Sequence, residues 1–206
     1  MKILSYSFLF CALLFSQHCS ADIVESGPGI DPIIDNDPAG STSSINIGVD
    51  QEVVDVEVTI NNFTHDWVGD LVVTITSPSG TEANLIVRTG GGLGDSSDVN
   101  GTYTFTDAAI GGANWWDVAD GLGSGEVIPP GSYAATDEFG NEISLADAFA
   151  GESTLGNWTI FASDNASDSV GGFESWQLRI VTAVPEPSSL AVLATMSLAG
   201  LLRRRK

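Results

Sequence analysis

Apolar and polar side chains alternate in several short runs along the middle of the chain. The run VVDVEVTI (residues 53–60) has the two-residue period of a strand with one buried face. DLVVTITSP (70–78) and ANLIVR (83–88) are rich in β-branched residues, and Ser77-Pro78-Ser79-Gly80 between them is typical of a tight reversal. Runs of similar character span residues 102–109, 157–164 and 173–181. These patterns predict six strands.

Helical periodicity is confined to a short stretch at residues 145–150, and Gly-rich turns at 90–92 and 121–125 separate the other runs. Many short strands joined by such turns predict an all-β fold, an antiparallel, jelly-roll-like β-sandwich. The segment that precedes the first run is rich in Gly, Pro, Asp and Ser. We therefore expect residues 22–33 to form a loop-rich lead-in and not a packed element.

The N-terminus has the composition of an export signal. Lys2 is followed by the apolar run ILSYSFLFCALLF, and Cys19-Ser20-Ala21 supplies small residues for cleavage. We expect a signal peptide over residues 1–21, cleaved after Ala21. Both cysteines of the chain lie within it, so the mature protein should contain no disulfide.

The C-terminus combines a short apolar segment with a basic end. Residues 190–202 are too few to span a bilayer, which takes about 20 residues, and Pro185 and Pro187 prevent the helix from extending backwards. The cations that follow obey the positive-inside pattern. This arrangement predicts a short hydrophobic helix that associates with the membrane transiently.

Residues 183–206 resemble the PEP-CTERM sorting signal. The matching features are a Pro-Glu-Pro motif (Pro185, Glu186, Pro187), the apolar segment and an arginine-rich end (Arg203, Arg204, Arg205). The resemblance implies export through the inner membrane of a Gram-negative bacterium, processing by an exosortase-type enzyme, and delivery to the cell surface or the extracellular space. An ordinary C-terminal membrane anchor is the alternative.

The body of the chain resembles the P domain of proprotein convertases, also called P/Homo B. His65, the Gly69-Asp70-Leu71 step and SPSGT (77–81) match its first motif, while GNW (156–158) and GGFESWQL (171–178) match its second. The resemblance implies a β-sandwich over residues 34–182 that stabilises a protease in convertases but performs no catalysis itself. Residues 111–151 are less typical, so loop contacts there are not carried over.

The charge of the body excludes some classes of partner. Residues 22–184 contain 26 acidic residues and only two cations, Arg88 and Arg179, which gives a formal charge of −24. Such a surface repels nucleic acid and anionic lipid. His65 is the only histidine beyond the signal peptide, and we expect it to form a structural hydrogen bond and not part of a Ser-His-Asp relay. The sequence thus predicts no enzyme, and a hydrolase that uses paired carboxylates is the least favoured interpretation.

Two sets of residues are candidates for binding. Carboxylates in and near the predicted turns could hold Ca²⁺, which takes six to eight oxygen ligands. The candidates are Asp70, Asp95, Asp98 and Asp107. The alternative is that these carboxylates are solvated surface groups. In the Gly-rich segment, one of Trp115 and Trp116 is expected to be exposed, where it could stack on sugar rings; the alternative is that the pair packs over one end of the sandwich.

The functional hypothesis is an exported, non-catalytic module with a structural or adhesive role at the cell surface or in extracellular matrix. Extracellular polysaccharide or surface proteins are its expected partners. The alternative is a carbohydrate-binding module that uses the tryptophan pair.

Overall fold

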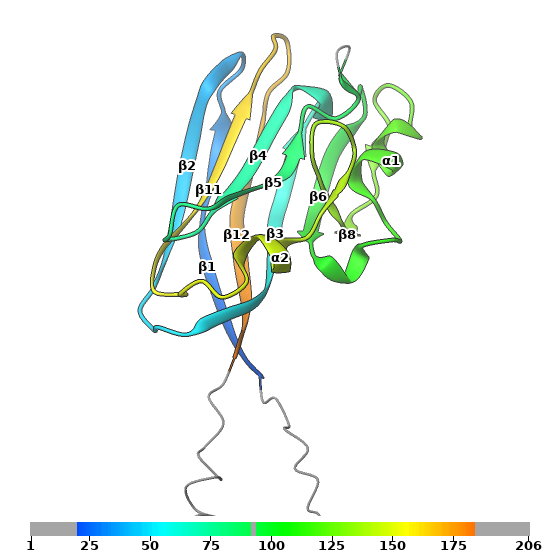
Figure 1. Ribbon diagram of the computed structural model, residues 1–206. Coiled ribbons are helices and arrows are strands. Elements are labelled where there is room, and N and C mark those ends of the chain that lie inside the picture. The colour runs from blue at the N-terminus through cyan, green and yellow to red at the C-terminus, as the bar shows by residue number, and fades with distance from the viewer. Residues whose placement is uncertain (1–19, 92–93, 184–206) are drawn as a thin grey trace, which may run out of the picture. The chain divides into compact units, whose positions relative to one another are not determined.

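The structure, a computed structural model, describes residues 20–91 and 94–183 and contains two packed, largely antiparallel sheets (Figure 1). In strand order, the first sheet consists of β1 (Ser20–Ile33), β12 (Gly171–Ala183), β3 (Glu52–His65), β6 (Asp98–Phe105) and β7 (Val127–Ile128), and β8 (Gly131–Tyr133) also pairs with β6. The second sheet consists of β2 (Asp37–Ile47), β11 (Gly156–Asp164), β4 (Leu71–Thr76) and β5 (Glu82–Val87). Only β7 and β8 run parallel to their neighbour. The expected all-β sandwich is confirmed.

One hydrophobic cluster joins the two sheets, and the alternation seen in the sequence accounts for it. Val58 and Ile60 of β3 and Leu178 of β12 are fully buried from one side, and Trp158 and Ile160 of β11 from the other. Alternate residues of the same strands are partly exposed. The two-residue period therefore separates core from surface, as it does in other sandwiches.

The six predicted strands correspond to β3, β4, β5, β6, β11 and β12, with shifts of a few residues at their ends. The predicted reversal also forms, because the Ser77 amide donates to the Thr81 carbonyl at 2.9 Å and the Gly80 amide to the Ser77 carbonyl at 3.0 Å. The predicted short helix is α2 (Leu145–Phe149), whose first turn is capped by the Ser144 hydroxyl.

Several short elements outside the main strands were not predicted. They are α1 (Trp115–Asp120), the 3-10 turns η1 (Val68–Asp70) and η3 (Asp107–Ala109), and a small hairpin of β9 (Ala135–Thr136) and β10 (Glu142–Ile143). The α1 helix begins after Asn114, whose side chain accepts a hydrogen bond from the Asp117 amide at 3.1 Å.

The expectation of a loop-rich lead-in at residues 22–33 is wrong. These residues belong to β1, which pairs with β12 from Ser20↔Ala183 to Ile33↔Gly171. Glycine is needed here for packing, since a Cβ at Gly27 would lie 2.6 Å from the Trp176 indole nitrogen. Proline is tolerated because β1 forms an edge of its sheet.

Both sorting signals lie outside the described residues, apart from their boundaries. This holds for residues 1–19 of the signal peptide and for the hydrophobic helix and the motif expected within residues 184–206, which include Pro185, Glu186, Pro187, Arg203, Arg204 and Arg205. Within the part of the chain that is described, no helix combines the length and the apolar character needed to cross a membrane.

Candidate functional site

The tryptophan pair does not form an exposed binding surface. Trp115 is fully buried, its indole nitrogen donates to the Thr89 hydroxyl at 3.1 Å, and its ring contacts Tyr103, Phe105 and Tyr133 at centroid distances of 5.3–5.6 Å. The expectation that Trp115 contacts a ligand is therefore wrong, because the α1 helix turns this side chain into the core. Trp116 is partly buried and lies against Gly140, where a Cβ would come within 2.9 Å of the ring.

Two of the four candidate calcium ligands serve local structure. The carboxylate of Asp107 accepts hydrogen bonds at the N-terminus of α2, from the Ser144 hydroxyl at 2.5 Å and the Leu145 amide at 2.7 Å. The carboxylate of Asp95 accepts from the amide of Ser97 at 2.9 Å and also from its hydroxyl. Both carboxylates thus have partners within the chain.

The other two candidates, Asp98 and Asp70, have raised pKa values. For Asp98 the cause is first desolvation and then the nearby Asp66 carboxylate. The structure does not gather the four residues into one site: among residues 20–91 and 94–183, no three His, Cys, Asp or Glu side chains lie close enough together to hold a metal ion. Calcium binding stays a prediction, and Asp70 is the candidate with the most unusual surroundings.

His65 forms a buried pair with Asp164 next to Asp70. Its Nε2 lies 3.0 Å from Oδ2 of Asp164, and both side chains are fully buried. The other oxygen of Asp164 accepts from the Ala166 amide at 2.9 Å. Nδ1 of His65 has no hydrogen-bond partner among the described atoms, so no serine hydroxyl extends the pair into a catalytic relay.

A cavity of about 420 Å³ opens beside this pair, lined by Trp67, Asp70, Ala166, Ser167, Asp168 and Ser169. Its walls come from the η1 turn and from the loop between β11 and β12, which lies at the top of Figure 1. Asp70 is only 6% exposed, and within the described residues its carboxylate has no hydrogen-bond donor and no cation within 4.0 Å. Its pKa is raised, first by burial and then by the Asp164 carboxylate, while Arg88 and His65 act in the opposite direction.

Three residues around the cavity have positive φ angles, which residues other than glycine rarely adopt. Trp67 has φ of 134°, Asp168 has φ of 82°, and Arg88, which donates from Nη1 to the Asn165 carbonyl at 2.9 Å, has φ of 43°. Such strain persists only where the surrounding structure enforces it, and it is common at functional sites. The fold thus holds the walls of the cavity in place.

Sequence reasoning selected Asp70 but missed Trp67 and Asp168. The sequence did contain a signal for Trp67. It is an aromatic residue between Asp66 and Asp70 in HDWVGD, directly after the alternating pattern of β3 ends. No such signal marks Asp168. It lies in the β11–β12 loop, about 100 residues after Trp67 in the chain, and only the fold places this loop beside Trp67.

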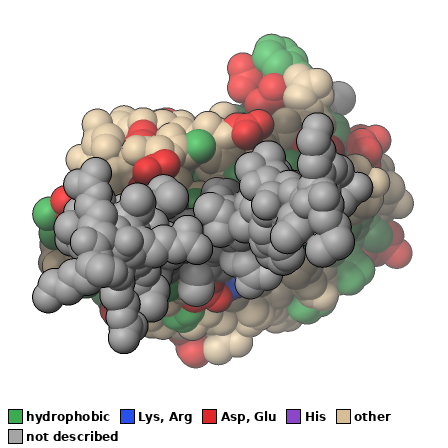
Figure 2. Space-filling model, turned by 60° about the horizontal axis from the view of Figure 1, so that its bottom comes forward, with side chains coloured by type: hydrophobic (Ala, Val, Ile, Leu, Met, Phe, Trp, Pro, Cys, Tyr) green, Lys and Arg blue, Asp and Glu red, His purple; other side chains and the backbone are tan. Residues whose placement is uncertain are grey.

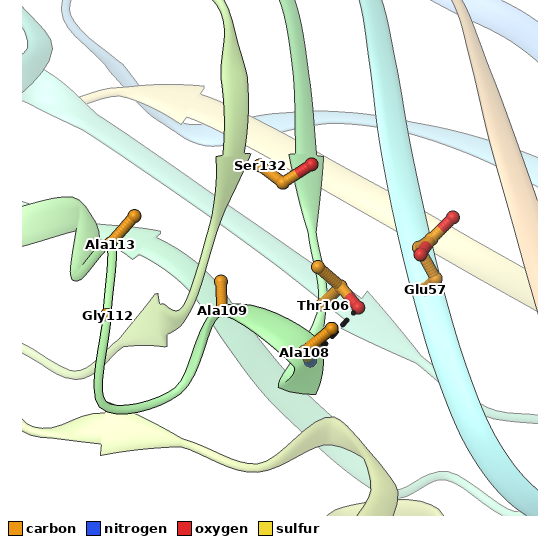
Figure 3. Close-up of a pocket in the computed structure, with 7 residues that line it drawn as sticks. All are labelled: Glu57, Thr106, Ala108, Ala109, Gly112, Ala113 and Ser132. Atoms are coloured by element: carbon orange, nitrogen blue, oxygen red, sulfur yellow. Dashed lines mark hydrogen bonds between the residues drawn. The ribbon is translucent and has the colours of Figure 1, made fainter.

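A second hollow, of about 430 Å³, lies over β3 and the η3 turn (Figure 3). Glu57 and Thr106 border it, and its remaining lining consists of small residues: Ala108, Ala109, Gly112, Ala113 and Ser132. The Thr106 hydroxyl already accepts from the Ala108 amide at 3.3 Å. This hollow contains no strained residue and no buried polar group without a partner, so it is the weaker candidate.

The surface around these features is acidic. Figure 2 shows carboxylates scattered over the visible part of the described surface, with little blue from Lys or Arg. In residues 20–91 and 94–183 the ion pairs are the buried His65–Asp164 pair and the Arg179–Asp22 pair, which joins the ends of β12 and β1 at 2.8 Å. Most acidic side chains therefore have no cationic partner in this part of the chain.

Comparisons with known proteins agree with the architecture. The proprotein convertase P-domain family matches residues 52–118 and 130–180, which is more than half of the chain. The PEP-CTERM protein-sorting motif matches residues 183–206. Neither is a catalytic domain. A search of curated proteins finds no match.

Two solved structures of a serine protease from Aeromonas sobria are similar to this chain. The complex of that protease with its chaperone, ORF2, gives 16% identity and a TM-score of 0.49 over 81% of this chain, and the protease by itself gives 15% and 0.48 over 83%. The chain spans about 28% of the length of each of these proteins. On the basis of the family match, the chain belongs to the proprotein convertase P-domain family and carries a PEP-CTERM sorting motif at its C-terminus.

Proposed function

We propose that this protein is a non-catalytic P-domain module that has a structural or adhesive role at the bacterial cell surface or in extracellular matrix. The observation that carries the proposal is the order of the two matches: the P domain ends at residue 180 and the sorting motif begins at residue 183. The P domain is therefore the part of the chain that the motif delivers. PEP-CTERM motifs indicate export and surface sorting by an exosortase-type system.

The buried His65–Asp164 pair supports a non-catalytic role. Its carboxylate and imidazole are closed off from solvent, and Nδ1 of His65 lacks a partner among the described atoms. General base catalysis requires hydrogen-bond reach to a reacting group, directly or through one water. A buried pair between the last residues of β3 and β11 is suited to holding these two strands together.

The alternative of a carbohydrate-binding module has lost one of its two expected contacts. Trp115 is in the core, and Trp116 offers only a partly buried ring. A pull-down with the extracellular polysaccharide of the producing bacterium tests this alternative. Retention of the protein that is lost on Trp116→Ala, in a variant that still unfolds cooperatively well above the assay temperature, would support it over the adhesive role.

The intact mass of the protein isolated from a producing bacterium tests the proposal. We expect a mass that lacks residues 1–21 and the part of the chain beyond the Pro-Glu-Pro motif. Replacement of Pro185, Glu186 and Pro187 by alanine should leave the C-terminal segment in place, whereas Ser188→Ala serves as the control. A full-length mass, or processing that persists in the triple variant, would contradict sorting through this motif.

A further inference from the structure

The carboxylate of Asp70 faces the cavity and is not sealed from solvent. Asp70 is 94% buried, lines the cavity beside the β11–β12 loop and accepts no hydrogen bond within the described residues. Burial of a charged group is unfavourable unless hydrogen bonds or an opposite charge compensate for it. Within the described residues, no hydrogen-bond donor and no contacting cation compensates for the charge of Asp70, so a ligand that donates hydrogen bonds and carries positive charge would bind there favourably.

The charged groups that face Asp70 leave a local excess of negative charge. Asp164 on β11 and Asp35 in the β1–β2 turn raise its pKa, whereas Arg88 and His65 lower it. Arg88 lies beyond ion-pair distance and uses Nη1 to bind the Asn165 carbonyl. His65 is occupied with Asp164 at 3.0 Å. Neither Arg88 nor His65 therefore compensates for Asp70 by direct contact.

The rim of the cavity combines one aromatic side chain with polar and acidic groups. Trp67 is 38% exposed and lines the opening. The other exposed residues of the lining are Ser167 and Asp168, so a second carboxylate stands at the opening. An indole beside the carboxylates of Asp70 and Asp168 suits a ligand with an apolar stem and a cationic head.

We propose that the cavity lined by Trp67 and Asp70 receives a lysine or arginine side chain of a protein partner. The cationic head would bind the Asp70 carboxylate through charge-assisted hydrogen bonds, and the aliphatic stem would pack against Trp67 at the rim. This inference rests on the proposed adhesive function and names the chemistry of its partner. The acidic surface of the domain would steer a basic partner towards it.

A calcium ion fits this cavity less well. Calcium takes six to eight oxygen ligands at 2.3–2.6 Å, and the described residues include no cluster of three carboxylate or imidazole side chains. A cavity of about 420 Å³ also holds far more than one ion. A neutral sugar could stack on Trp67, but it would leave the charge of Asp70 uncompensated.

The walls of the cavity are held in place before any ligand arrives. The Asn165 amide donates to the Asp70 carbonyl at 2.8 Å, and the Ser169 hydroxyl donates to the Asp66 carbonyl at 3.2 Å. A preformed site avoids the entropic cost of ordering loops on binding.

The cavity is also well placed for contact with a partner. β12 begins at Gly171, next to the cavity, and ends at Ala183, so the cavity lies at the end of the sandwich where β12 begins.

The test uses the exported protein in its processed form and four blocked pentapeptides, Gly-Gly-X-Gly-Gly, in which X is lysine, arginine, glutamine or norleucine. Titration calorimetry should show saturable binding of the lysine or arginine peptide, with a dissociation constant of about 1 mM or below, that weakens as salt is added. The glutamine and norleucine peptides should not bind. Binding that does not depend on the cation would overturn the proposal.

Variants assign the binding to the cavity. Asp70→Asn should weaken binding of the lysine peptide about tenfold or more, because a charge-assisted hydrogen bond is lost. Asp117→Asn on the exposed face of α1 is the matched control and should leave affinity unchanged. Trp67→Gly should also weaken binding, and it should fold because glycine adopts φ of 134° without strain. Equal affinity in Asp70→Asn and the unsubstituted protein would contradict the assignment.

Two further probes distinguish competing occupants. These probes are calcium chloride alone and a neutral glucose oligosaccharide. If either of them binds at Asp70 and the lysine peptide does not, the proposal is refuted. If no probe binds but the intact mass shows both processing events, the proposed function stands and this inference fails.

Discussion

Replacement of Trp115 separates a role in the core from a role in ligand binding. The side chain is fully buried, is surrounded by three aromatic rings and donates its indole hydrogen to Thr89, which is itself fully buried. Truncation of a buried tryptophan to alanine costs about 3–5 kcal/mol. In a domain of this size each kcal/mol lowers the melting temperature by about 2–4 °C. Trp115→Ala should therefore melt about 6–20 °C below the unsubstituted protein.

The neighbouring residue provides the control. Trp116 is only partly buried, so Trp116→Ala should cost about 1 kcal/mol and lower the melting temperature by a few degrees. Trp115→Phe keeps an aromatic ring but leaves the Thr89 hydroxyl without its donor, which should cost about 1–3 kcal/mol. Thermal unfolding followed by circular dichroism measures all three. Equal melting temperatures for the two alanine variants would refute the assignment of Trp115 to the core.

Four further predictions follow from the same contacts. His65→Ala and Asp164→Ala should each lower the free energy of unfolding in urea by about 3–5 kcal/mol. The double variant should lose clearly less than the sum of the two, and additive effects would show that the pair is not coupled. Because the pKa of Asp70 is raised above its ordinary value of 3.8, the folded state binds more protons than the unfolded chain, and stability should fall as pH rises above that value. Asp70→Asn should remove this loss and melt higher than the unsubstituted protein at pH 7; a lower melting temperature would indicate a partner for Asp70. Asp107→Asn should cost about 1 kcal/mol in thermal unfolding through the N-terminus of α2, and no change would contradict the cap. If calcium binds at Asp70, as the sequence suggested, calcium should raise the melting temperature, chelator should reverse that rise, and Asp70→Asn should abolish it.

The sequence determined the strands that carry their own local pattern. The alternation of β3 and the β-branched runs of β4 and β5 need only a two-residue period and suitable side chains, so they can be recognised without knowledge of their partners. The same holds for the turn at Ser77–Gly80, for the Pro-Glu-Pro motif and for each of the two P-domain motifs, because the residues of each lie close together in the sequence.

The tertiary structure decided what depends on distant residues. β1 is rich in Gly and Pro and has little strand propensity of its own, yet it pairs with β12 about 150 residues away, where Gly27 makes room for Trp176. Trp115 is buried because α1 packs onto an aromatic cluster, which no local pattern near it announces. The cavity joins Trp67 and Asp70 to a loop about 100 residues later in the chain. Local periodicity shows which face of a segment is apolar, but it does not show which segments contact one another. The burial of Trp115 and the position of Asp70 in the cavity wall both depend on contacts between distant segments.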